Sequence, residues 1–141
     1  VNAKIIDNKF SNLKWITPEY PETPLQEINY LNEAKNILIK DKNPKILITD
    51  YQFLSVIIEN NYVSPNKWYD DLSVPPKESK FFEQYREFYH SQIKSQKIKN
   101  IYTVGLDKEK YIKVVFDKTC YEEEKMSKIL TKLSLKTCKE F

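Results

Sequence analysis

Two short apolar runs, each set between segments of helical periodicity, constrain the fold of this chain most. The runs span residues 45–50 and 99–104, and turn-forming residues bound both of them. Runs of this kind are typical of strands buried on both faces of a parallel sheet. Because helices and strands alternate as they do in crossover units, we expect an α/β fold, a small Rossmann-like three-layer domain with a mostly parallel sheet and helices on both faces.

The strongest helix signal lies just before the first run. Thr23 precedes Pro24, and Gln26 follows three residues after the threonine, which is the pattern of a capping box with proline at the first helical position. Apolar residues then recur at three- and four-residue spacing as far as Leu38. The sequence therefore predicts a helix from residue 24 to about Lys40.

Weaker patterns indicate the remaining elements. We expect helices at 51–60, capped by Asp50, at 79–96, capped by Ser79, and after Asp107, followed by a last strand within 127–138. A strand is the alternative for the segment after Asp107, because residues 112, 114 and 115 are β-branched. The three glutamates at 122–124 are expected in the solvated first turn of a short helix capped by Thr119.

The chain is expected to form one domain, with an entry arm at 1–22 and an α/β core at 23–141. Short apolar pieces, followed by three prolines between residues 17 and 24, indicate an extended arm or an entry strand. Residues 60–76 form a long irregular segment. Loops of this length are uncommon in compact domains unless they are functional or mobile.

Composition argues against several classes of function. Gly105 is the single glycine, so the glycine-rich phosphate loops and the nucleophile elbow of serine hydrolases are absent. Lysines are interleaved with 20 carboxylates and joined by one arginine, Arg86, so no basic stripe points to nucleic acid. No apolar run approaches the roughly 20 residues that span a bilayer. The single histidine, His90, has no ligand motif nearby, so neither a metal site nor a cofactor is expected.

Polar residues that follow the predicted strands are the first candidates for a ligand-binding site. In open parallel sheets, ligands bind beyond the carboxyl ends of the strands. This rule selects Asp50, Tyr51 and Gln52 after the first strand and Asp107 after the second. Asp50 has a structural alternative as a helix cap, since aspartate is strongly preferred at that position.

The second candidate surface lies in the long irregular segment. Trp68 and Tyr69 are followed by Asp70 and Asp71, which places an aromatic pair beside two carboxylates. Such a surface can stack a sugar ring and bind its hydroxyl groups. The alternative is that Trp68 anchors the loop onto the core, because aromatic side chains contribute much burial energy.

Two cysteines, Cys120 and Cys138, bracket one element near the C-terminus. A disulfide between them would close a loop of roughly 18 residues and stabilise the domain by about 3 kcal/mol in the chain-entropy model. An extracytoplasmic compartment would permit this bond. The alternative is two unrelated buried thiols, since free cysteine packs as a small hydrophobic residue.

Several segments together resemble a known family. They are LKWITP at 13–18, KILITDYQF at 45–53, NKWY at 66–69 and IYTV at 101–104, followed by the two cysteines. They resemble the C-terminal soluble region of polytopic bacterial membrane glycosyltransferases of the dolichyl-phosphate-mannose-protein mannosyltransferase-like class. The resemblance covers nearly the whole chain, although each motif is short.

The resemblance implies a non-catalytic domain on the extracytoplasmic (periplasmic) side of a bacterial membrane. In that class, the transmembrane part transfers sugar from a lipid-linked donor, so no catalytic residue carries over. The implied partners are the transmembrane part of the parent chain and an acceptor or glycan, and the absence of an initiator methionine agrees with an excised domain. The alternative is a free-standing α/β enzyme that acts on a small polar substrate at Asp50 and Asp107.

Overall fold

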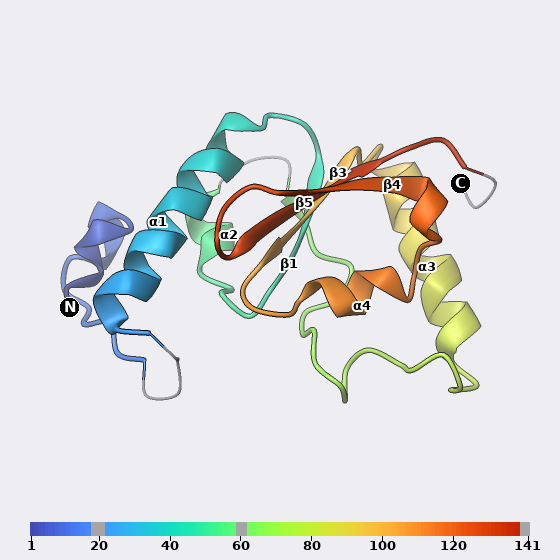
Figure 1. Cartoon of the computed structure of the whole chain (residues 1–141), viewed down its shortest axis with the longest axis horizontal. Helices are drawn as coiled ribbons and strands as arrows, with labels where there is room; N and C mark the ends of the chain where they lie inside the picture. Colours follow the sequence, from blue (N-terminus) through green and yellow to red (C-terminus); the bar gives the residue numbers. More distant parts are fainter. Residues whose placement is uncertain (18–21, 59–61, 139–141) are drawn as a thin grey trace.

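The computed structural model describes residues 1–17, 22–58 and 62–138 (Figure 1). The helices are α1 (Pro24–Lys40), α2 (Leu54–Ile57), α3 (Phe82–Ser95) and α4 (Glu109–Lys113), with short 3-10 turns η1 (Ala3–Ile5), η2 (Asn8–Phe10) and η3 (Lys118–Cys120). The strands are β1 (Lys45–Thr49), β2 (Tyr62–Val63), β3 (Asn100–Val104), β4 (Tyr121–Lys125) and β5 (Leu130–Leu135). Within these described ranges, no helix is both long enough and apolar enough to cross a bilayer.

The strands form one mixed sheet in the order β2-β1-β3-β5-β4. β1 runs parallel to β2 and β3, whereas β5 runs antiparallel to β3 and β4. Among the four longer strands, one pair is parallel and two pairs are antiparallel, so the expectation of a mostly parallel sheet is wrong. Only residues 126–129 connect β4 to β5. A link this short can form a hairpin but cannot hold the crossover that a parallel pair requires. The fold is therefore a mixed α/β fold and not clearly Rossmann-like.

Helices cover both faces of the sheet, as expected. Leu47 of β1 and Tyr102 of β3 lie in a core with α1, α2 and the N-terminal turns. Ile46 and Ile101, one residue earlier on each strand, lie in a second core with α3, α4 and the loop before α3. Successive strand residues point to opposite faces, and in β1 both faces are buried. This burial explains why the run at 45–50 is apolar without alternation.

The predicted start of α1 is confirmed. The Thr23 hydroxyl accepts a hydrogen bond from the Gln26 backbone amide at 3.3 Å, and the Gln26 side chain accepts one from the Thr23 amide at 2.9 Å. The helix ends at Lys40, and both predicted central strands are present. Gly105 follows β3 with a φ of 128°, a conformation that L side chains rarely adopt.

The two helices expected at 51–60 and 79–96 are shorter than predicted. α2 begins at Leu54, and Asp50 does not cap it, because the Thr49 hydroxyl accepts the Tyr51 amide and the Asp50 carboxylate pairs elsewhere. Ser79 forms a separate turn whose hydroxyl accepts the Phe81 amide, so α3 begins three residues later. The following segment forms the short helix α4, which decides against the strand alternative there.

Two predictions near the C-terminus are wrong. Residues 122–124 lie in strand β4, where they pair with β5, and not in a helix. The preceding turn η3 is capped by Asp117, which accepts the Thr119 amide at 3.0 Å, so Thr119 is not the cap. Three adjacent glutamates are uncommon in a strand, but all three are exposed at a sheet edge, where charge discourages pairing with other chains.

The first residues do not form an extended arm. η1 and η2 fold back on themselves, and Ala3 and Ile6 are buried in the core that contains α1. The antiparallel contact expected of an entry strand is limited to one isolated bridge between Asn2 and Lys14. Asn2 and Asp7 cap the two turns, which explains why polar residues interrupt the apolar pieces there. The central part of the proline-rich connection, 18–21, lies outside the described residues.

Candidate ligand-binding site

The parallel strands β1 and β3 have their carboxyl ends at the same edge of the sheet. An ion pair there connects the residue after β1 to the segment that follows β3. The Lys108 ammonium lies 2.5 Å from the Asp50 carboxylate and donates a hydrogen bond to the Tyr69 carbonyl at 3.1 Å. The Lys108 side chain is only 15% exposed. β2 and β3 flank β1 on opposite sides, so this edge corresponds to the position at which open α/β sheets bind ligands.

The other three candidates at the strand ends lie in different surroundings from one another. The Gln52 side-chain amide donates to the carbonyls of Thr49 and Lys67, both at 2.9 Å, and so attaches the long loop to this edge. Tyr51 points to the other face of the sheet and is hydrogen-bonded to Glu27. Asp107 adopts a left-handed backbone with a φ of 56° in the turn before α4 and does not cap that helix.

Glu27 is a buried carboxylate that the sequence analysis did not single out. Its side chain accepts hydrogen bonds from the Trp15 indole at 2.8 Å and from the Tyr51 hydroxyl at 2.7 Å, and the residue is only 4% exposed. The sequence signal for the burial of Glu27 was its position, four residues before Leu31 on the apolar stripe of α1. Glu27 joins the N-terminal segment, α1 and the end of β1, which is a structural role.

The structure separates the aromatic pair of the long loop. Tyr69 is buried, and its hydroxyl lies 2.9 Å from the hydroxyl of Tyr89 on α3, so Tyr69 anchors the loop. Trp68 remains 48% exposed. Hydrogen bonds from the Ser73 side chain and backbone lower the pKa of Asp70, whose carboxylate holds the following turn. The anchoring role that the alternative assigned to Trp68 belongs to its neighbour.

The segment 71–76 lies between two surface grooves, one on each side. A groove of about 560 Å³ separates it from α3, and a smaller groove of about 350 Å³ separates it from α4. The large apolar side chains along the first groove include Leu72, Phe81 and Phe88, which are 98%, 57% and 46% exposed. Exposed aromatic and aliphatic side chains gathered at a groove are typical of a binding surface.

Polar groups lie within the same two grooves. Asp71 lines both of them, accepts a hydrogen bond from the Tyr111 hydroxyl at 3.1 Å, and lies 3.6 Å from the Lys110 ammonium. Gln84 and Ser79 line the larger groove beside the aromatic rings. Of the candidates named from the sequence, only Asp71, the neighbour of Asp70, takes part here. We call the larger groove, between segment 71–76 and α3, the loop groove.

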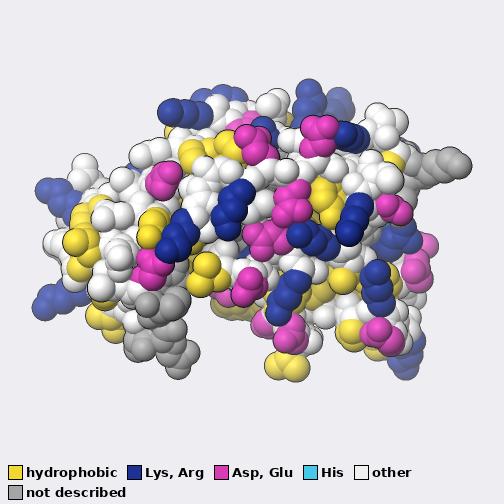
Figure 2. Space-filling view, viewed as in Figure 1, with side chains coloured by type: hydrophobic (Ala, Val, Ile, Leu, Met, Phe, Trp, Pro, Cys, Tyr) yellow, Lys and Arg dark blue, Asp and Glu magenta, His cyan; other side chains and the backbone are white. Residues whose placement is uncertain are grey.

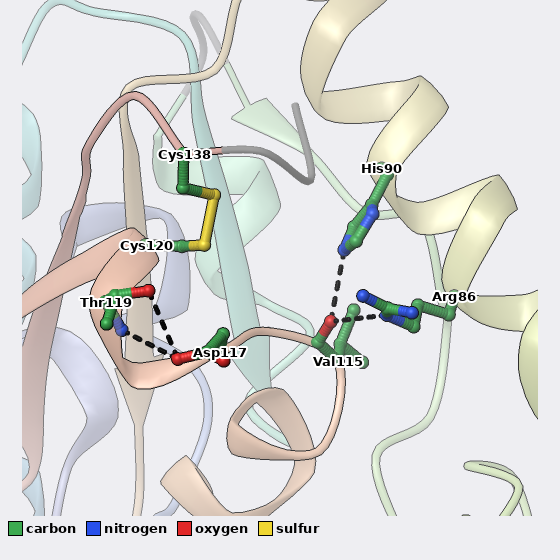
Figure 3. The surroundings of a disulfide bond; sticks show 7 residues. All are labelled: Arg86, His90, Val115, Asp117, Thr119, Cys120 and Cys138. Atoms are coloured by element: carbon green, nitrogen blue, oxygen red, sulfur yellow. Dashed lines mark hydrogen bonds between the residues drawn. A yellow bond between two sulfur atoms is a disulfide. The ribbon is translucent and has the colours of Figure 1, made fainter.

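The predicted disulfide between Cys120 and Cys138 is confirmed, with Cα atoms 5.2 Å apart. Beside it, the side chains of Arg86 and His90 reach from α3 to the carbonyl oxygen of Val115 (Figure 3). The His90 ring also stacks on Phe116, with ring centroids 5.0 Å apart. These contacts hold the segment after α4 against α3, which gives His90 a structural role.

A separate polar cluster lies at the amino ends of β1 and β3. Partial burial raises the pKa of Asp41, but hydrogen bonds from Tyr102, Asn100 and Asn43 more than offset this and bring its pKa to about 2. The buried ammonium of Lys45 donates to the carbonyls of Asp41 and Asn43, and burial lowers its pKa. These hydrogen bonds all join groups of the domain itself, so the cluster stabilises the fold.

Within the described part of the chain, no three histidine, cysteine or acidic side chains are grouped in a way that could hold a metal ion. No protein family, curated protein or solved structure matches the chain. The candidate site therefore depends on the geometry of the loop groove and of the strand-end edge.

Proposed function

We propose that this chain is a non-catalytic, extracytoplasmic domain of a membrane-bound glycosyltransferase and that it binds a glycan or acceptor in the loop groove. The observation that carries this proposal is the meeting of exposed aromatic rings and polar side chains along one open groove. The link to a glycosyltransferase, and the tether to a transmembrane part of the same parent chain, come from the sequence resemblance.

The chemistry of the loop groove suits a sugar ligand. The rings of Phe81 and Phe88 can stack on the C–H face of a pyranose, which is an apolar surface without hydrogen-bonding demand. Asp71 and Gln84 offer carboxylate and amide groups for the sugar hydroxyls. The groove is open and not enclosed by protein, which is compatible with an extended chain of sugars.

The disulfide supports the proposed location. Disulfides persist in oxidising compartments such as the bacterial periplasm and are rare in the cytosol. The bond between Cys120 and Cys138 is compatible with that location.

A small α/β enzyme is the second candidate, because Asp50 and Lys108 meet at the sheet edge where such enzymes bind ligands. In this structure, however, the strand-end groups are engaged internally. Lys108 contacts Asp50 and a loop carbonyl, and Gln52 contacts two carbonyls. In the loop groove, the rings of Phe81 and Phe88 are exposed, and the Asp71 carboxylate is largely exposed although it contacts Tyr111 and Lys110, so we place glycan binding first.

Calorimetric titration with a panel of bacterial surface oligosaccharides tests the proposal. We expect Phe88→Ala to weaken binding by roughly tenfold, because the substitution removes a stacking ring worth about 1 kcal/mol or more. Trp68→Ala is the matched control, since Trp68 is exposed to a similar degree but does not line the loop groove. Equal loss of affinity in both variants, or no binding of any oligosaccharide, would contradict the proposal.

A further inference from the structure

Two N-terminal segments, 1–5 and 13–16, lie side by side and form one exposed surface. The Ala3 amide donates to the Leu13 carbonyl at 3.0 Å, and the Trp15 amide donates to the Val1 carbonyl at 2.7 Å. The bridge between Asn2 and Lys14 lies between these two bonds. We call the exposed side of these segments the N-terminal face.

Aliphatic side chains are unusually exposed on the N-terminal face. Ile16 is 77% exposed, Leu13 56%, Val1 44% and Ile5 40%. Segment 1–5 buries Ala3 in the core beside α1, and Ile6, which directly follows it, is buried there as well, so this part of the chain is amphipathic. The exposed aliphatic groups are therefore additional to those that the fold requires.

The charge of this face is positive. Lys4 and Lys14 are exposed, and neither side chain has an acidic partner among the residues that the structure describes. Elsewhere, lysines pair with carboxylates, as in Lys110 with Asp71, Lys113 with Glu123, Lys128 with Glu22 and Lys136 with Glu122. Figure 2 shows the contrast, with lysines beside apolar side chains at the end formed by the N-terminal turns, and lysines alternating with acids over the middle.

The face is held firmly by the rest of the domain. The Trp15 indole donates to the buried carboxylate of Glu27, and the Lys35 ammonium on α1 donates to the carbonyl of Ile6. These bonds attach segment 13–16, and the residue directly after segment 1–5, to α1. The exposed aliphatic groups and the ammonium groups of Lys4 and Lys14 are therefore presented together on a folded part of the domain.

We infer that the N-terminal face docks onto the surface of an anionic lipid bilayer. Exposed aliphatic side chains flanked by lysines are the composition that binds in the interface of anionic membranes, where the apolar groups enter the headgroup boundary and the ammonium groups meet lipid phosphates. The inference rests on the proposed function for the membrane setting, but it depends on residues that are remote from the loop groove in sequence and contacts.

Sedimentation with phospholipid vesicles tests the inference on the 141-residue chain. Vesicles of phosphatidylcholine mixed with phosphatidylglycerol are compared with vesicles of phosphatidylcholine alone. Lys4→Gln with Lys14→Gln is expected to lower partitioning onto anionic vesicles by on the order of 30-fold, and Leu13→Ser with Ile16→Ser by roughly tenfold. Lys40→Gln with Lys94→Gln, and Ile39→Ser with Leu106→Ser, are matched controls, since these side chains are exposed outside the N-terminal face and the loop groove.

The inference holds if the anionic vesicles bind the chain, both face variants lose binding and both controls keep it. It is overturned if neither vesicle binds the chain, if neutral vesicles bind it equally well, or if the controls lose as much binding as the face variants. The oligosaccharide titration is also run on the unchanged chain and on the face variants, which should keep their glycan affinity. Glycan affinity without vesicle binding by the unchanged chain overturns this inference alone, whereas vesicle binding without glycan affinity overturns only the proposed function.

Discussion

Two lysines with opposite surroundings mark the two ends of β1. Lys45 is 1% exposed, and its ammonium is satisfied by backbone carbonyls near Asp41. At the other end, Lys108 reaches across the sheet edge to Asp50. Buried ammonium groups are costly unless they are hydrogen-bonded. The two clusters therefore stabilise the parallel pair at its ends and leave the exposed groove side chains available for binding.

Asp41 gives a pH-dependent prediction. Its folded pKa of about 2 lies below the ordinary value of 3.8, so its contribution to stability is fully present above about pH 4 and is lost as the pH falls towards 2. Asp41→Asn should lower the free energy of unfolding by about 1–2 kcal/mol near pH 6, since charge-assisted hydrogen bonds are lost and solvent screens part of the effect.

The measurement is urea denaturation of both proteins at pH 6 and at pH 2.5. The difference in unfolding free energy between them should shrink at the lower pH, because Asp41 is then protonated in the unfolded chain, where its pKa is near the ordinary 3.8, while it is still largely ionised in the native protein. A difference that stays constant or grows at low pH would show that the Asp41 carboxylate does not stabilise the fold through its charge.

Single residues were predictable where one local rule decides, and not where a distant partner decides. The capping pair of Thr23 and Gln26 was predicted because its whole signal lies within four adjacent residues. Tyr69 and Trp68 are adjacent and chemically similar, and only the position of Tyr89 on α3 determines which of them is buried. Likewise, Asp50 carries a strong capping preference, but the approach of Lys108 determines its contact.

Helices and strands, like single residues, were predictable where local sequence signals decide the structure and not where contacts with distant strands decide it. The cap, the proline and the apolar stripe all favour α1, and the helix has the predicted bounds. In β4, the three glutamates favour a helical first turn locally, but pairing with β5 outweighs that preference. The edge strand β2 could not be found in the long loop, because its two residues become a strand only by pairing with β1.

The disulfide connects η3 to the chain after β5. Its removal is expected to change the stability of the domain. Cys120→Ser with Cys138→Ser should lower the free energy of unfolding by about 3 kcal/mol, because an 18-residue loop in the unfolded chain is no longer closed. Denaturation of the variant and of the wild type, each with and without reductant, measures this. If reductant destabilises the variant as much as the wild type, or if the two proteins are equally stable, the bond does not contribute as expected.

The whole molecule combines a parallel half, β2-β1-β3, with an antiparallel hairpin, β4-β5. The expectation of helices on both faces came from the alternation of elements and was correct. Strand direction could not be inferred in the same way, because the apolar pattern of a buried strand is similar in parallel and antiparallel pairs. The loop groove also escaped prediction, since it forms where the long loop meets α3.

Chemical-shift mapping of the ¹⁵N-labelled chain with bacterial surface oligosaccharides tests the central claim most directly, because it locates a ligand without assuming its site. We predict saturable shifts at residues 71–76 and along α3 around Phe88, with none at Asp50 and Lys108. Shifts centred on Asp50 and Lys108 would contradict glycan binding in the loop groove and favour the enzyme alternative, and the absence of saturable shifts with every oligosaccharide would contradict glycan binding.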